Sequence, residues 1–298
     1  MAIAVESQLA VGEGVKGRSL TQDAFRRFFR NPTGILGLGI ISFFIIVSLL
    51  APVVRPYDAS RDRNLRARLS PPSAEHWFGT DELGRDLFTR VWHGGRISLR
   101  VGLLAVVMAL TVGTTLGLTA GFFGGWFDTL VVWLVDILLA FPGILLAIAI
   151  VATLGPSLTN ALVAISITQI PVYVRITRVV TLALRETEYV QAARALGSSP
   201  RRIIFAHILP NGLSPLVVQL TLSVGVAILD VAALGFLGLG AQPPDPEWGV
   251  MIRDGFRQFL RAPWMSIFPG LAIFFSVVGF NLLGDAIRDV LDPRLKNA

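Results

Sequence analysis

Six apolar stretches, each about 20 residues long or longer, dominate this chain of 298 residues. They cover approximately residues 34–54, 101–123, 130–154, 158–184, 213–240 and 265–283. An α-helix needs about 20 mostly apolar residues to cross the hydrocarbon core of a bilayer. Because backbone polar groups cannot stay unpaired in lipid, each stretch is predicted to be helical. The sequence therefore predicts an all-α polytopic membrane protein with six transmembrane helices.

The composition agrees with a bilayer as part of the solvent. Hydrophobic residues make up 53% of the chain and charged residues only 15%, whereas soluble domains carry about 25% charged residues. The formal net charge is +6, and the basic residues fall between the apolar stretches. Arginines in such places are typical of membrane-flanking loops, so a lipid bilayer is the expected partner and nucleic acid is not. The absence of cysteine excludes disulfides and thiol chemistry.

The polar segments divide the chain into regions. We expect an N-terminal arm at 1–33, a first transmembrane helix at 34–54, a long loop at 55–98, a five-helix core at 99–290 that carries a polar insertion at 185–211, and a tail at 291–298. Six spans would place both ends of the chain on one side. Fourteen basic residues then lie on that side and twelve on the other, which is a slight preference for cytoplasmic termini.

Two patterns within the spans concern helix packing. Gly113, Gly117 and Gly121 recur every four residues, which predicts a stripe of small residues where another helix approaches closely. The Pro142-Gly143 pair lies within the third stretch. Proline lacks the backbone N–H that a helix interior needs, so this pair is expected to kink or end the helix.

Two carboxylates lie within predicted spans, Asp136 in the third and Asp230 in the fifth. A carboxylate in hydrocarbon is costly, so each must face protein or water. They are candidates for polar groups of a translocation path, and a structural hydrogen bond between helices is the alternative interpretation.

The insertion between the fourth and fifth spans is the most informative segment. Residues 188–211 read E-Y-V-Q-A-A-R-A-L-G-S-S-P-R-R-I-I-F-A-H-I-L-P-N. Local rules predict a helix over about 185–196 that stops at Gly197, which tolerates the left-handed conformation after a helix. Ser199 is then a suitable N-cap and Pro200 a suitable first residue for a second helix that ends near Pro210. A helix-turn-helix can bind DNA, but membrane spans flank this one on both sides.

This insertion resembles the coupling loop of binding-protein-dependent ABC importer permeases, whose pattern is E-A-A-x₃-G-x₉-I-x-L-P. The position of the glutamate holds Gln191, that of the isoleucine holds His207, and Glu188 lies about one turn earlier. In that family the loop forms a helix that sits in a groove of the ATPase. The resemblance therefore implies an ATPase-coupling loop made of Glu188, Gln191, Ala192, Ala193, Gly197, Ser199, Pro200, Leu209 and Pro210.

Other segments extend the resemblance from about residue 20 to the end of the chain. They are H-W-F-G-T-D-E-L-G-R-D at 76–86, G-R-I-S-L at 95–99, L-D-V-A-A-L-G-F-L-G-L-G-A-Q-P-P at 229–244 followed by E-W-G at 247–249, and L-D-P-R-L-K at 291–296. They resemble the C-subunit type of the dipeptide, oligopeptide and nickel permeases, and dipeptide permeases most. The resemblance implies a type I ABC importer permease fold in a bacterial or archaeal plasma (inner) membrane. It also implies cytoplasmic termini and coupling loop, and extracytoplasmic loops at 55–98 and 241–263.

The implied function is movement of dipeptides or short oligopeptides by alternating access. The implied partners are a homologous second permease subunit, two ABC ATPase subunits and an extracytoplasmic substrate-binding protein. ATP hydrolysis by a P-loop requires G-x₄-G-K-[ST], and neither lysine, Lys16 or Lys296, is followed by Ser or Thr. The chain is therefore expected not to be an enzyme and to hold no cofactor, with ATP and Mg bound by the partner ATPases. The three histidines, at positions 76, 93 and 207, do not form a metal-ligand pattern.

Several alternatives stay open at this point. The substrate could be nickel or another small solute that a separate binding protein recognises. A secondary transporter driven by an ion gradient would need Asp136 and Asp230 and no ATPase. An exporter-type or mechanically gated complex would use the same ATPase coupling without a binding protein. A membrane enzyme would need a catalytic constellation, and none is evident in the sequence.

Overall fold

The computed structural model describes residues 25–291 of the chain. The N-terminal arm expected at 1–33 and the tail expected at 291–298 therefore lie largely outside the described residues. Within them the main helices are α2 (Pro32–Val54), α3 (Leu87–Phe123), α4 (Gly125–Leu139), α5 (Gly143–Leu154), α6 (Leu158–Arg185), α10 (Leu213–Phe236), α11 (Trp248–Phe256) and α12 (Trp264–Leu291). Short helices are η2 (Leu65–Ala67), α7 (Glu188–Ala195), α8 (Pro200–Arg202), the π-helix η3 (Ile203–Ile208) and α9 (Leu209–Asn211).

The membrane-spanning helices match the six apolar stretches, with one difference in the third. Five helices are long and apolar enough to cross a bilayer, namely α2, α3, α6, α10 and α12. The stretch at 130–154 is divided into two helices, since α4 and α5 meet at a bend of 91° and only together make a sixth span. Pro142 stands directly before α5, so the predicted break at Pro142-Gly143 is confirmed. With 15 residues, α4 is about 22 Å long, which is shorter than the hydrocarbon core.

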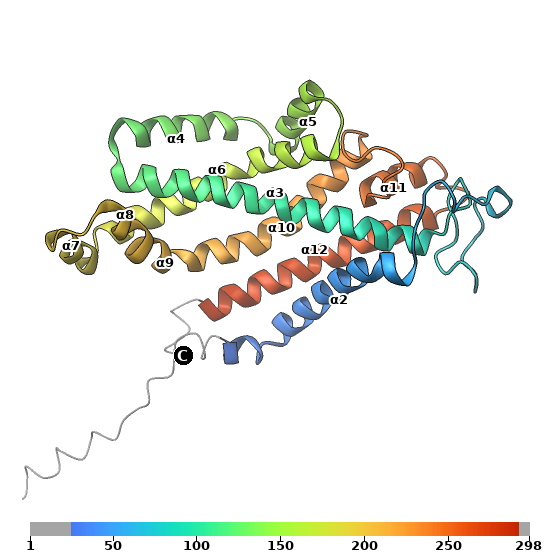
Figure 1. The fold of residues 1–298 in the computed structure, drawn as a ribbon, viewed down its shortest axis with the longest axis horizontal. Helices are drawn as coiled ribbons and strands as arrows, with labels where there is room; N and C mark the ends of the chain where they lie inside the picture. Colours follow the sequence, from blue (N-terminus) through green and yellow to red (C-terminus); the bar gives the residue numbers. More distant parts are fainter. Residues whose placement is uncertain (1–24, 292–298) are drawn as a thin grey trace, which may run out of the picture.

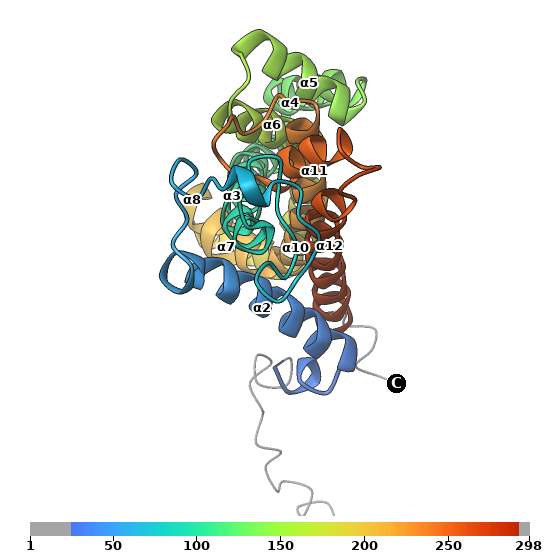
Figure 2. The same cartoon turned by 90° about the vertical axis from the view of Figure 1, so that its right-hand side faces the viewer.

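The long helices run side by side along the longest axis of the molecule (Figure 1). In both views α3 lies between α6, α10 and α2, while α4 and α5 form one edge of the bundle and α2 with α12 the other (Figures 1 and 2). The helices α7 to α9 lie at the same end as the start of α2 and the end of α12 (Figure 1). We call this the insertion end. The opposite end, with residues 55–86 and α11, is the loop end.

Close contact between α3 and α6 depends on the predicted stripe of small residues. A Cβ atom added to Gly113 would lie 2.6 Å from the Cβ atom of Tyr173, and one added to Gly117 would lie 2.7 Å from the carbonyl oxygen of Val174. Real Cβ atoms essentially never approach so closely. The stripe is therefore confirmed as the surface on which α6 packs.

The helix α3 begins earlier than the sequence predicted. Asp86 is its N-cap, and the carboxylate accepts a hydrogen bond from the backbone N–H of Thr89 at 2.9 Å. The last twelve residues of the region 55–98 are therefore helical. Hydropathy missed this part because it is rich in polar side chains. With 37 residues, α3 is about 55 Å long and extends beyond the hydrocarbon core at the loop end.

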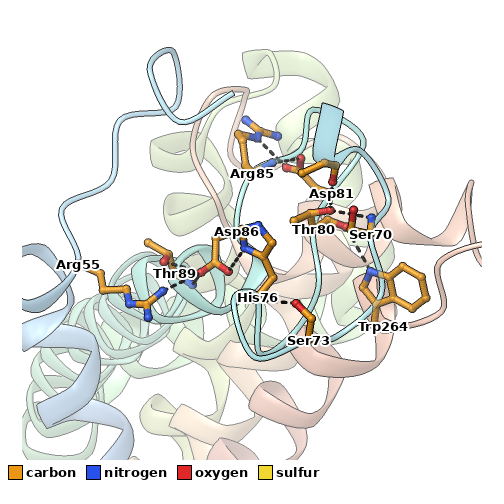
Figure 3. A network of polar contacts seen from close by, with 11 residues as sticks. Arg55, Ser70, Ser73, His76, Thr80, Asp81, Arg85, Asp86, Thr89 and Trp264 are labelled. Carbon is orange, nitrogen blue, oxygen red and sulfur yellow. Dashed lines mark hydrogen bonds and ion pairs between the residues drawn. The ribbon is translucent and has the colours of Figure 1, made fainter. Parts of the chain in front are cut away.

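Residues 55–86 form a folded structure that is tied to the bundle (Figure 3). The indole N–H of Trp264 donates to the carbonyl oxygen of Thr80 at 3.2 Å, and the amide of Gln258 donates to Glu82 at 2.8 Å. The rings of Phe78 and Phe268 stack with centroids 3.9 Å apart. The loop is therefore fixed on α12 and on the segment that precedes it.

A buried ion network fixes the same loop on the start of α3. The carboxylate of Asp81 accepts hydrogen bonds from the side chains of Arg85 and Arg90, and from the backbone N–H groups of Leu83 and Arg85 at 2.8 and 2.9 Å. Only 1% of Asp81 and 4% of Arg90 are exposed. Asp86 in addition contacts His76 at 3.1 Å and Arg55 at 3.6 Å (Figure 3).

Candidate functional site

The first helix of the insertion, α7, ends as the sequence predicted. Gly197 has a φ angle of +79°, which is the left-handed region that glycine adopts without strain. Its N–H donates to the carbonyl oxygen of Arg194 at 3.0 Å, and that of Ser198 donates to Ala193 at 3.1 Å. This pair of bonds is the Schellman motif, which satisfies the last carbonyl groups of a helix. The helix starts at Glu188 and not near Arg185, because α6 continues through Arg185.

The second part of the insertion begins as predicted and ends differently. The hydroxyl of Ser199 accepts a hydrogen bond from the backbone N–H of Arg202 at 3.4 Å, and Pro200 is the first helical residue. The chain then widens into the π-helix η3 and continues through Pro210 to Asn211. We expected Pro210 to end the helix. The wider π turn accommodates a proline that cannot donate a hydrogen bond to the preceding turn.

One side of the insertion is fixed on the transmembrane helices by an apolar cluster. We call this set the anchor cluster, and its buried members are Leu118, Val190, Ile203, Ile204 and Ile208, with Phe122, Leu184 and Leu209 packed beside them. Leu118 and Phe122 belong to α3, and Leu184 belongs to α6. Through this close packing the insertion is held against the ends of α3 and α6.

The opposite side of the insertion is exposed and partly apolar. Leu196 is 87% exposed, Phe205 is 65% exposed and Tyr189 is 43% exposed. Large exposed apolar side chains among charged residues are typical of a surface that contacts another protein. We call this surface the coupling face, and it comprises Glu188, Tyr189, Gln191, Ala192, Leu196, Gly197, Ser199, Pro200 and Phe205, all of which are exposed.

The predicted coupling residues therefore divide between the two sides. Ala193 is buried, and Leu209 packs on the anchor cluster. Gln191 is exposed, but its side-chain amide donates to the carbonyl oxygen of Glu186 at 3.1 Å. A glutamate at this position could not donate that bond. The amide thus ties α7 to the connection that follows α6.

The two intramembrane carboxylates lie in different surroundings and are not brought together. Asp136 on α4 pairs with Arg175 on α6, and the two side-chain atoms lie 2.7 Å apart. Both side chains are more than half exposed. Asp230 lies on α10, and no described residue forms an ion pair or hydrogen bond with its side chain. The helix α6 contacts both α4 and α10.

Replacing Asp136 by asparagine tests the interpretation as an ion-gradient transporter. We expect transport to fall by less than about tenfold, because asparagine keeps an oxygen that can accept the hydrogen bond from Arg175. Uptake into proteoliposomes with ATP inside is the measurement. A proton relay would need the carboxylate, so abolished uptake with Asp136→Asn, while Glu75→Gln on the exposed loop has no effect, would favour the gradient-driven mechanism.

Two contacts of the described residues were not predicted. Asp128 on α4 receives two hydrogen bonds from the guanidinium of Arg178 on α6, one of them at 2.6 Å. Together with the pair at Asp136 it fastens α4 along α6. The sequence does contain a signal for this pair, because Asp128 lies near the start of one apolar stretch and Arg178 lies within another. Charged residues at such places need a partner of opposite charge, but the sequence does not show which residue it is.

The second contact joins α3 to the segment before α11. Glu247 is fully buried; it accepts hydrogen bonds from the hydroxyl of Ser98 at 3.0 Å and from the backbone N–H groups of Gly249 and Val250 at 2.8 and 3.0 Å. Burial raises the pKa of the Glu247 carboxyl, and these donors oppose the rise. The side chain caps the N-terminus of α11 and holds it against α3.

The described residues contain no group of three or more His, Asp or Glu side chains that could hold a metal ion. His76 contacts Asp86, His93 contacts the carbonyl oxygen of Arg55 at 2.9 Å, and His207 lies beside the ring of Tyr189. Each histidine within this part of the chain thus has a local structural neighbour.

Comparison with known proteins identifies the family. Residues 113–297 match the family described as binding-protein-dependent transport system inner membrane component, and residues 19–72 match the N-terminal TM domain of oligopeptide transport permease C. The dipeptide transport system permease protein DppC of Alkalihalophilus pseudofirmus is 54% identical over 93% of this chain and 90% of its own length. The glutathione transport system permease protein GsiD of Salmonella typhimurium is 46% identical over 94% of this chain and 92% of its own length.

Solved structures agree on the fold. Chains from inward-facing structures of the MetNI methionine ABC transporter superpose with TM-scores of 0.50 and 0.51, at 22% and 24% identity, over 69% of this chain and 96% and 97% of theirs. The expected all-α permease fold of ABC importers is thereby confirmed. The chain belongs to the binding-protein-dependent transport system inner membrane components, and within them it is a multi-pass membrane permease of the oligopeptide permease C type.

Proposed function

We propose that this permease moves dipeptides or short oligopeptides inward across the plasma membrane, driven by ATP hydrolysis in partner subunits. The peptide substrate is supported by the high identity to a dipeptide permease and to glutathione permeases over nearly the whole chain. The observation that carries the proposal is the two-sided structure of the insertion at residues 185–211. Its anchor cluster packs on α3 and α6, and its coupling face is exposed and partly apolar.

The proposed orientation places the insertion end in the cytoplasm and the loop end outside. In this orientation the coupling face meets an ABC ATPase, and the folded loop at residues 55–86 meets an extracytoplasmic substrate-binding protein. The complete transporter would contain a homologous second permease and two ATPase subunits, which bind ATP and Mg. This chain would contribute no cofactor of its own.

The proposed mechanism is alternating access driven from the coupling face. Closure of the ATPase dimer on ATP displaces α7, and the anchor cluster transmits the displacement to α3 and α6. Because α3 is one continuous helix of 37 residues from the insertion end to the loop end, its movement reaches both ends. A peptide released from the binding protein then enters the opened path.

Copurification tests the composition of this complex. The chain is isolated from its host in a mild detergent, and the proteins that come with it are identified by mass spectrometry. We expect P-loop ATPases and a second six-span permease. Recovery of the chain alone, or as a homo-oligomer, would contradict the proposal and would direct attention to a gradient-driven mechanism.

The substitution Gly197→Val tests the coupling role. No atom lies within 4 Å of a Cβ atom added at Gly197, so the substitution acts through the backbone and not through a clash. A β-branched residue resists the left-handed conformation at a cost of about 1–2 kcal/mol, which corresponds to about a 5- to 30-fold change in the population of the native turn. We expect peptide uptake per hydrolysed ATP to fall, by at most this factor, while the complex still assembles and hydrolyses ATP.

The matched control is Gly197→Asn, because asparagine tolerates the left-handed region better than other non-glycine residues. We expect it to retain most of the coupling between hydrolysis and uptake. Equal uptake per ATP in the valine variant and the unmodified protein would show that the turn at Gly197 does not matter for transmission.

A further inference from the structure

The loop end contains a large cavity outside the coupling insertion. Its volume is about 1030 Å³, and α2, α3, the start of α6, residues 57–60 and the connection between α10 and α11 surround it. Part of its wall is apolar, with Leu49, Leu104 and Leu158 among the lining residues. Small-molecule pockets have volumes of about 300–1,000 Å³, so this cavity has room for a short peptide.

The charged residues of the cavity are balanced in sign. Arg96 and Arg100 of α3 line it, and so do Asp58 and Asp245 from two different connections. The two arginines are exposed, and no described residue forms an ion pair or a hydrogen bond with either guanidinium. Residues four apart on a helix lie on one face with Cβ atoms about 5–6 Å apart, so both guanidinium groups can reach one carboxylate.

The two acidic residues differ in how firmly they are held. Asp58 accepts hydrogen bonds from the backbone N–H groups of Ser60 and Arg61 at 2.8 and 3.2 Å. These bonds lower the pKa of the Asp58 carboxyl and keep it ionised. Asp245 is exposed, and within the described residues its carboxylate has no hydrogen-bond partner. Asp245 is therefore the carboxylate that is available to an ammonium group.

Beyond the cavity, the same exposed face of α3 carries further polar groups. The exposed residues on this face recur every three or four positions, as they do on one side of a helix. They are Arg96, Arg100, Leu104, Val107, Thr111 and Thr115. The threonine hydroxyls donate to backbone carbonyl oxygens one turn earlier, each at 2.7 Å. A spanning helix with arginine and hydroxyl groups on one face turns that face toward water or protein and not toward lipid.

We propose that this cavity binds the two charged termini of the transported peptide, with Arg96 and Arg100 on the carboxylate and Asp245 on the ammonium group. The proposal rests on the proposed function as a peptide permease and names the part of the chain that meets the substrate first. Two cations and two anions around one cavity complement a ligand that carries one charge of each sign. Recognition of the termini beside apolar walls leaves side chains free to vary, so the ligand class is short peptides with unmodified ends.

Protection of a single cysteine tests binding without relying on transport. The chain has no cysteine. The substitution Thr159→Cys places a single thiol on the exposed wall of the cavity, and this thiol is then the only one in the chain. The complete transporter with this variant is labelled with N-ethylmaleimide in membrane vesicles, and the labelling rate of the complex that contains the unmodified chain is subtracted. The probes are trialanine, trialanine amide and N-acetyltrialanine.

We expect trialanine to slow labelling about fivefold at a concentration of about four times its Kd, by mass action. Loss of a charge-assisted contact weakens binding more than about tenfold, so each blocked peptide should protect little at the same concentration. Arg96→Gln with Arg100→Gln should abolish protection by trialanine. The control variant Arg66→Gln, on an exposed loop residue outside the cavity, should leave protection unchanged.

Three results would overturn the proposal. They are no protection by trialanine, equal protection by all three peptides, and protection that the arginine substitutions leave intact. A phospholipid headgroup also offers a charge to Arg96 and Arg100, so protection by dihexanoyl phosphatidylglycerol but not by trialanine would assign the cavity to lipid. Uptake of radiolabelled trialanine by the unmodified complex tests the proposed function separately, since uptake without protection would refute only the cavity.

Discussion

Replacing Asp81 by alanine is expected to destabilise the protein by about 3–5 kcal/mol, the usual cost of removing one partner from a buried ion pair. The carboxylate lies between Arg85 and Arg90, and the side chain of Arg90 is only 4% exposed. Without Asp81 two positive charges stay buried with no compensating anion. The backbone N–H groups of Leu83 and Arg85 lose their acceptor as well. Resistance to unfolding, measured on the purified chain in detergent, should fall accordingly.

The matched control for this experiment is Glu75→Ala, because Glu75 lies exposed in the same loop and its side chain forms no hydrogen bond or ion pair with the described residues. Surface substitutions of this kind usually change stability by no more than about 0.5 kcal/mol. The double variant Asp81→Leu with Arg90→Met should recover part of the loss, since well-packed apolar residues can replace a buried pair. Equal stability of Asp81→Ala and Glu75→Ala would refute the assignment of this network as a fixed joint.

Replacing Trp248 by alanine should cost about 3–5 kcal/mol, the range for truncating a buried aromatic side chain. Trp248 is fully buried, packs edge-on against Phe44 and donates its indole N–H to the carbonyl oxygen of Val91 at 2.8 Å. Gly94 makes room for this segment, since a Cβ atom there would lie 2.1 Å from the carbonyl oxygen of Pro246. The substitution leaves a large hole between α3 and α11.

Thermal inactivation of the purified chain, followed by loss of the monodisperse peak in size-exclusion chromatography, measures this effect without relying on tryptophan fluorescence. Trp126→Ala is the control, because Trp126 on α4 is 78% exposed. Trp248→Phe should lie between the two, since it keeps an aromatic ring but loses the hydrogen bond from the indole to the carbonyl oxygen of Val91. A Trp248→Ala variant as stable as the Trp126→Ala variant would show that α11 is not fastened through this side chain.

The insertion at residues 185–211 shows which features of a site can be predicted from neighbouring residues in the sequence. The stop at Gly197 and the cap at Ser199 depend only on neighbouring residues, and both are present in the structure. The division into an anchored side and an exposed side was not predictable in the same way. Burial of Ile203 and Ile204 depends on Leu118, which is more than 80 residues away along the chain.

The third span shows the limit of hydropathy. Residues 130–154 are apolar throughout most of their length, and the position of the break was predictable from Pro142. The bend of 91° was not, because its size depends on how α4 and α5 pack on α6. The two ion pairs between α4 and α6 likewise join residues that are 39 and 50 positions apart.

The sequence by itself determined that the chain is helical, that it spans the membrane about six times, where the insertion turns and which family it resembles. These properties follow from runs of apolar residues, from glycine and proline at single positions, and from short motifs. Only the tertiary structure decided the network around Asp81, the joint at Glu247 and Trp248, and the charged cavity at the loop end. Each of these needs side chains from segments far apart in the chain, and only packing of the whole bundle brings them within contact distance.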